Sequence, residues 1–127
     1  MKRPAFMDAL GFEIERSEKD GIVLRMAVPD DLMSPFGQVH GGAIAALFDT
    51  GLAVAVHRHL ALEDRVATHS LSISYVAFSA EQLLRCHARV VRVANAVATA
   101  EGEVMTGSGK LVAKALGTFG VRRSARR

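Results

Sequence analysis

The sequence is poor in several features that define whole classes of protein. It has a single cysteine, Cys86, in 127 residues, so no internal disulfide can form and nothing points to an oxidising compartment. Its most apolar stretch, 41–56, is shorter than the roughly 20 residues of a bilayer span and contains Asp49. The N-terminus lacks the apolar run of about 7–15 residues that a secretory signal has. These absences predict a cytoplasmic protein with no membrane partner.

The net charge is also small in the body of the chain. The formal net charge is +3, from 16 Lys and Arg against 13 Asp and Glu, but four arginines lie in the last six residues. The rest of the chain is therefore almost neutral. A nucleic-acid groove needs clustered positive charge on the folded surface, so we expect no nucleic-acid partner. The composition predicts one domain over 1–121 and a solvated basic tail over 122–127.

Two groups of strands are predicted, one in each half of the chain. The first has strands over 11–15 and 21–28, and the turn between them ends in Asp20-Gly21, a pair typical of β-hairpins. The second follows from period-two patterns and hairpin-length links, which indicate antiparallel pairing. Its four strands are predicted over 68–75, 83–93, 96–105 and 110–121. In the first of these four, hydroxyl residues alternate with larger ones: Thr68, Ser70, Ser72 and Ser74 against His69, Leu71, Ile73 and Tyr75.

One helix is predicted between the two groups, from about Gly42 to Leu60, by its composition and length. Gly51 inside it costs about 1 kcal/mol relative to Ala, and the close approach of another backbone would explain it. One long helix and a sheet of five to six antiparallel strands indicate an α+β fold in which the helix covers one face of the sheet.

The predicted helix is apolar on both faces. Ile44, Leu47, Phe48 and Gly51 form the face expected on the sheet. The opposite face is nearly as apolar, with Ala45, Ala46, Asp49, Ala53 and Val56. A helix that is apolar all round is buried all round, and one sheet cannot cover both faces. We therefore expect a second copy of the chain to cover the other face.

Two features of this region can carry chemistry. The turn before the helix, Gly37-Gln38-Val39-His40-Gly41-Gly42, brings small residues to a helix N-terminus, whose first amides are unpaired and suit a carbonyl that gains negative charge. The alternative is a simple glycine turn with His40 bonded locally. Asp49, the second feature, is a carboxylate among small residues on the apolar helix, a setting that suits a general base. Its alternative is a structural hydrogen bond to a hydroxyl of a neighbouring strand.

Geometry links these two features only through a second chain. Gly41 and Asp49 are eight residues apart, roughly 12 Å along a helix. A base and an oxyanion donor that serve one carbonyl each lie about 3 Å from their atoms. Two antiparallel helices in a symmetric dimer bring Gly41 of one chain to Asp49 of the other.

The pattern Gly37-x-Val39-His40-Gly41-Gly42-Ala43-x-x-Ala46-Leu47-x-Asp49, followed by Thr68 and then Ser74-Tyr75, resembles the hotdog-fold acyl-CoA thioesterases of the PaaI-like branch. The resemblance implies a curved antiparallel sheet wrapped around one long helix. It also implies active sites shared by two chains, a homodimer or a homotetramer built from dimers, and an acyl-CoA substrate with no further cofactor.

The same resemblance implies roles for individual residues. Asp49 is the general base or nucleophile, the Gly41 amide polarises the thioester carbonyl, Thr68 positions the attacking water, and His40 shapes the turn. Six residues before His40, many members of the branch have an Asn, while this chain has Ser34, which can still donate a hydrogen bond. Ser34, Gln38 as a substitute donor, and Gly42 are therefore the candidate substrate-binding residues. An acyl-thioester hydratase or dehydratase that recruits His40 is one alternative, and a non-catalytic acyl-CoA-binding module is another.

The remaining candidates point to other chemistry less well. His57 and His59 are two residues apart and face different directions on a helix, so we predict no metal site. There is no Gly-x-Ser-x-Gly elbow for a serine hydrolase. Cys86 is expected to be a buried, inert thiol. Arg85, Arg89 and Arg92 either contact CoA phosphates or form an exposed strand face.

Overall fold

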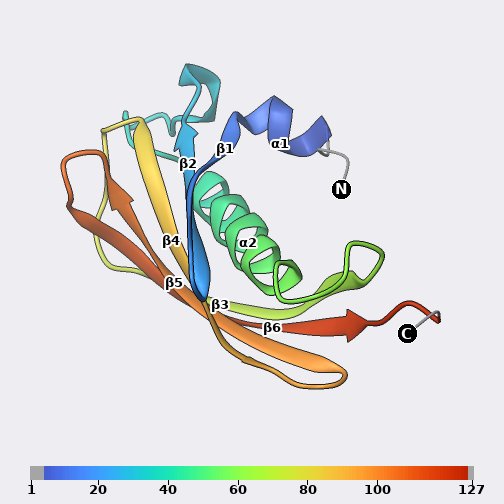
Figure 1. Cartoon of the computed structure of the whole chain (residues 1–127). Helices are drawn as coiled ribbons and strands as arrows, with labels where there is room; N and C mark the ends of the chain where they lie inside the picture. The colour runs from blue at the N-terminus through green and yellow to red at the C-terminus, as the bar shows by residue number, and fades with distance from the viewer. Residues whose placement is uncertain (1–4, 126–127) are drawn as a thin grey trace.

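One long helix lies in the concave face of a curved, six-stranded antiparallel sheet (Figure 1). The structure is a computed structural model that describes the backbone of residues 5–125 and the side chains from residue 8 onward. The sheet order is β1-β2-β4-β5-β6-β3. Its strands are β1 (Phe12–Glu18), β2 (Gly21–Ala27), β3 (Arg65–Tyr75), β4 (Leu83–Val93), β5 (Val97–Thr106) and β6 (Leu111–Arg122). The helices are α1 (Ala5–Leu10), the 3-10 turn η1 (Asp30–Leu32) and α2 (Gly41–His57). This is the predicted hotdog arrangement.

The predicted order of strand, strand, helix and four strands is confirmed, with differences at the ends of elements. α2 begins at Gly41 and ends at His57, three residues before the predicted end. The chain turns there because His59 N–H donates to Val56 O and Leu60 N–H to His57 O, which tightens the last turn. The short helix α1 was not predicted, since six residues give too little periodicity.

α2 packs on the sheet through the face that the sequence predicts. Ile44, Leu47, Phe48 and Gly51 are all buried. A side chain on Gly51 would begin 3.1 Å from the Cys86 sulfur of β4, so glycine is needed for a close approach of a side chain, not of a backbone as predicted. Val56 was assigned to the opposite face, but it is fully buried in the core of its own chain. On the helical wheel it lies between the half-covered Ala45 and Asp49, so its burial follows from its place in the last turn of α2 and not from its angle around the helix.

The opposite face of α2 is left half-covered by its own chain. Ala45, Ala46, Asp49 and Ala53 are neither buried nor fully exposed. They are small, so they leave a shallow surface beside the sheet rather than a filled core. This is the face that the sequence analysis assigns to a second copy.

A β-bulge in β3 changes which side chains face α2. The register of β3 against β6 shifts between Thr68 and Ser70, so His69 is the extra residue. Thr68 pairs with the buried Phe119, while Ser70 pairs with Thr118 and shares a hydrogen bond with it on the outer face. Without the bulge, strict alternation would place the Thr68 side chain on the outer face of the sheet, together with the serines of β3. The bulge instead turns Thr68 to the concave face, together with Leu71, Ile73 and Tyr75.

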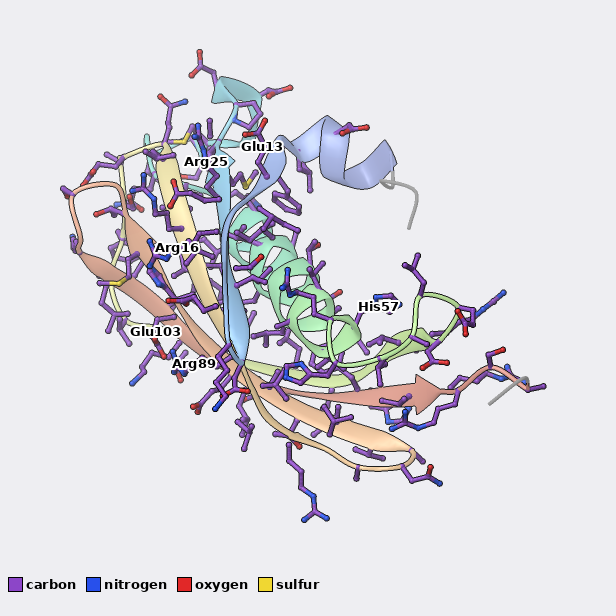
Figure 2. All side chains as sticks on the ribbon, viewed as in Figure 1. Glu13, Arg16, Arg25, His57, Arg89 and Glu103 are labelled. Atoms are coloured by element: carbon purple, nitrogen blue, oxygen red, sulfur yellow. The ribbon has the colours of Figure 1, made fainter. Side chains whose placement is uncertain are left out.

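The outer, convex face of the sheet carries paired charges. Arg89 on β4 donates to Glu103 on β5 at 2.6 and 2.9 Å, and Figure 2 shows both on the side of the sheet away from α2. The hydrogen bond from Arg89 holds the pKa of Glu103 below its usual range. Arg85 donates to Glu15 on β1 at 2.9 Å. Arg85 and Arg89 therefore have carboxylate partners on an outer strand face, and Arg92 is exposed.

The C-terminal end of the described chain includes the first residues of the predicted basic tail. Arg122 is the last residue of β6 and Arg65 is its partner on β3, while Arg126 and Arg127 of the basic tail lie outside the described residues. No helix in residues 5–125 is long and apolar enough to cross a membrane.

Removal of the Phe48 ring from the contact between α2 and the sheet should destabilise the fold strongly. Phe48 is fully buried, so Phe48→Ala is expected to lower the free energy of unfolding by about 3–5 kcal/mol through lost transfer energy and a residual cavity. Phe36 is 86% exposed, and Phe36→Ala is the matched control, with a change of about 0.5 kcal/mol or less. Urea denaturation measures both, and equal losses would contradict the packing described here.

Candidate active site

Asp49 and Thr68 meet at the middle of α2. The Thr68 hydroxyl donates to Asp49 Oδ1 at 2.6 Å, a short bond of the kind that a charged acceptor makes. Among the described residues no other group bonds to Asp49, so Oδ2 is available to a water or a ligand. The pair combines two expectations from the sequence, a carboxylate bonded to a strand hydroxyl and a threonine beside the carboxylate.

The first turn of α2 leaves one backbone amide unpaired. His40 is the N-cap, and its Nδ1 accepts from Gly42 N–H at 2.8 Å. His40 O accepts from Ala43 N–H at 2.9 Å and from Ile44 N–H at 3.4 Å. Within the described part of the chain, the Gly41 N–H alone has no acceptor at this helix start. It is therefore the donor through which the positive end of the helix dipole can meet a ligand oxygen.

Gly42 and His40 serve the turn itself. The Gly42 amide, carried as a substrate-binding candidate, is already used by His40, and the His40 side chain is a cap of the helix. The alternative interpretation of this turn, in which His40 bonds locally, therefore holds in the structure. It leaves Gly41 available as a donor, because His40 caps the amide of Gly42 and not that of Gly41.

Ser34 and Gln38 lie in a tight turn before the helix. Gly37 N–H donates to Ser34 O at 3.0 Å, and Gly37 has a φ of 74°, which favours glycine. The Ser34 hydroxyl accepts from Phe36 N–H at 3.3 Å and Gln38 N–H at 3.4 Å. Across the described residues no hydrogen bond joins Ser34 or Gln38 to Asp49, Thr68 or Gly41. Within one chain, these two candidates are therefore not bonded to the Asp49 pair.

Tyr75 is a residue of this site to which the sequence analysis gave no role. Its hydroxyl donates to Gly41 O at 2.7 Å, and its ring lies 3.6 Å from the point where a side chain on Gly41 would begin. The phenol is protonated at neutral pH and can donate, and burial raises its pKa further. Tyr75 is the single tyrosine of the chain and shares the concave face with Leu71 and Ile73. That shared face was the signal that could have found it.

Other reactive side chains are held away from this site. Cys86 is buried, and burial raises the pKa of its thiol to about 12, so it is inert as predicted. His57 Nε2 bonds to Asp64 O and His59 Nδ1 to Ala55 O. No group of three or more His, Cys, Asp or Glu side chains in the described part of the chain could hold a metal ion.

The chemistry available is a carboxylate with one free oxygen and, separately, a free amide at a helix N-terminus. The two lie on one helix about 12 Å apart, given a rise of 1.5 Å per residue. β3 touches both points of the helix, at Asp49 through Thr68 and at Gly41 through Tyr75. Such a carboxylate can accept a proton from water, and such an amide can stabilise an oxyanion.

The His40 cap is expected to stabilise the start of α2. His40→Ala leaves the Gly42 N–H without its acceptor and should lower the free energy of unfolding by about 1 kcal/mol. His40→Asn, which puts a preferred N-cap residue at the same position, should recover most of that loss. Thermal or urea unfolding checks both, and a His40→Ala variant as stable as the parent would contradict the capping role.

Comparisons with known proteins agree with this geometry. Residues 36–113 match the family model of the thioesterase superfamily. A phenylacetic acid degradation-related protein from Ralstonia eutropha JMP134 is 30% identical, with a TM-score of 0.88 over 94% of this chain and 92% of that one. A Bacillus halodurans protein solved with CoA is also 30% identical, with a TM-score of 0.87 over 96% and 81%.

A more distant match shows the same fold. A thioesterase from Haemophilus influenzae is 23% identical, with a TM-score of 0.87 over 93% of this chain and 82% of that one. A search of curated proteins finds no match. The family match covers more than half of the sequence and includes His40, Gly41, Asp49 and Thr68. The chain therefore belongs to the thioesterase superfamily and is a thioester hydrolase.

Proposed function

We propose that the protein is an acyl-CoA thioesterase that hydrolyses its substrate with Asp49 of one chain and the Gly41 amide of another. The observation that carries this proposal is the pairing of a strand-held carboxylate with a helix whose start leaves only the Gly41 amide without an acceptor in the described chain. The Bacillus halodurans relative solved with CoA supports CoA as the thiol part of the substrate. The family match supports hydrolysis.

In this mechanism, Asp49 acts as the general base. Thr68 fixes one carboxylate oxygen, and the other accepts a proton from water as the water oxygen adds to the thioester carbon. The carbonyl oxygen becomes an oxyanion and accepts a hydrogen bond from Gly41 N–H at the positive end of the helix dipole. Collapse of the intermediate breaks the carbon–sulfur bond, and the thiolate takes up the proton to leave as CoA. Direct attack by Asp49 on the carbonyl carbon is the alternative route.

The reaction requires a homodimer, because one chain holds its carboxylate and its free amide too far apart. Two properties of the chain support such an assembly. The face of α2 that carries Asp49 is half-covered and made of small residues, which lets a second helix approach closely. β3, whose side chains bond to both points of the helix, is an edge strand of the sheet and so has one side free for pairing. A homotetramer formed from two such dimers is the larger assembly that we propose.

Loss of the Asp49 carboxylate should abolish turnover. Asp49→Asn and Asp49→Ala are expected to lower kcat by about 100-fold or more, the range typical of a general base. The measurement is release of free thiol from short-chain, long-chain and aromatic acyl-CoAs. Asp31→Asn removes an exposed carboxylate from η1 and is the matched control, with parental activity. Activity of the Asp49 variants within a few-fold of the parent would remove the proposed base.

The same assay separates the alternative functions. A hydratase or dehydratase would consume the ultraviolet absorbance of an enoyl-CoA without thiol release. A non-catalytic module would bind acyl-CoA and turn over none of the acyl groups offered. Either result in the parent protein would overturn the proposed hydrolysis.

A bulky charge on the second face of α2 should dissociate the active assembly. Ala53→Arg is expected to convert a dimer or tetramer into a monomer that folds but does not hydrolyse substrate, because Arg cannot be buried unpaired between two helices. Ala80→Arg, at an exposed loop position, is the matched control. Light scattering measures the mass and circular dichroism the fold. A parent protein that is a stable monomer in dilute solution, yet active, would refute the shared site.

A further inference from the structure

One peptide group at the start of α2 is held at both of its polar ends. The peptide between Gly41 and Gly42 has its carbonyl oxygen bonded by the Tyr75 hydroxyl at 2.7 Å and its N–H bonded to His40 Nδ1 at 2.8 Å. His40 belongs to the turn before the helix, whereas Tyr75 comes from the last residue of β3. The peptide plane is therefore fixed from two elements that are 35 residues apart in sequence (from His40 to Tyr75).

This restraint matters because two successive glycines have little conformational preference of their own. Without a Cβ, the backbone at Gly41 and Gly42 can rotate widely, and the direction of the free Gly41 N–H would vary with it. A donor that must meet an oxyanion is effective only when it is oriented before the charge develops. The peptide that carries the Gly41 N–H is held by the bonds of Ala43 and Ile44 N–H to His40 O, and fixing the plane of the adjoining peptide restrains rotation on the other side of Gly41.

The side chain of Tyr75 is suited to this task. A tyrosine hydroxyl is protonated at neutral pH and so is a donor to Gly41 O, and burial raises the pKa of this one further. The ring lies 3.6 Å from the point where a side chain on Gly41 would begin, and half of the residue is exposed. The hydroxyl thus reaches the first turn of the helix from the last residue of β3.

We propose that Tyr75 is a positioning residue that orients the Gly41 amide for the thioester carbonyl by bonding to Gly41 O. The proposal rests on the proposed function, since it assigns Gly41 as the oxyanion donor. Tyr75 acts through the peptide and touches no reacting atom. Its contribution is expected in the transition state, where the oxyanion is formed, and not in substrate binding.

Tyr75→Phe tests this role because it removes one oxygen and keeps the ring. Loss of the hydrogen bond is expected to lower kcat about fivefold, with KM within twofold of the parent, in the thiol-release assay. Ser70→Ala is the matched control. It removes a hydroxyl from the same strand that shares a 2.8 Å bond with Thr118 on the outer face, and its kcat should equal that of the parent. Equal kcat values for Tyr75→Phe and the parent would overturn the proposal.

A second measurement does not depend on turnover. Amide hydrogen exchange at Gly42 should quicken in Tyr75→Phe and stay at the parental rate in Ser70→Ala, because only the former loosens the peptide that Gly42 N–H belongs to. Parental exchange in Tyr75→Phe would overturn the proposal even if kcat fell. If the parent protein releases no thiol from any acyl-CoA, the proposed function fails, and the exchange rates still decide whether Tyr75 restrains the peptide.

Discussion

The structure depends on the close packing of α2 in the concave face of the sheet. Gly51 permits the helix to lie this close to β4, because the side chain of any larger residue would press on the Cys86 sulfur. The edge strand β3 lies beside the packed helix, and two of its side chains bond to it. Thr68 bonds to Asp49 on the half-covered face, and Tyr75 bonds to the Gly41 carbonyl oxygen. The same contact that buries the core therefore places polar groups of β3 on the side of α2 that the core does not use.

At the N-terminus of α2, hydrogen bonds satisfy three backbone amides and leave a fourth without an acceptor. The His40 side chain accepts a hydrogen bond from the Gly42 amide, and its carbonyl oxygen accepts from the Ala43 and Ile44 amides. The Gly41 amide has no acceptor among the described residues. A helix start with every amide capped would be more stable but would offer no donor to a ligand. The open amide lies at the positive end of the helix dipole, where a developing negative charge is best stabilised.

Assembly and chemistry are coupled in the mechanism that we propose. In that mechanism the half-covered face around Asp49 serves both as the surface that joins two chains and as a wall of the reaction site. Because β3 is an edge strand and bonds to α2 at Asp49 and at Gly41, any pairing at that edge would act directly on both groups. On the outer face, Arg89 bonds to Glu103, on the side of the sheet away from α2 (Figure 2).

Local patterns in the sequence determined most of the elements and indicated the residues of the candidate site. The Asp20-Gly21 turn, the period-two strands and the apolar segment after Gly41-Gly42 are short-range signals, and the residues that they indicate form the elements they predict. Tertiary structure alone decided three points. Packing in the last turn of α2 buried Val56, a bulge at His69 turned Thr68 toward Asp49, and the path of β3 brought Tyr75 to Gly41. A pattern of alternation carries no information on where a strand adds a residue or how far a sheet bends, because both are set by contacts between segments distant in the chain.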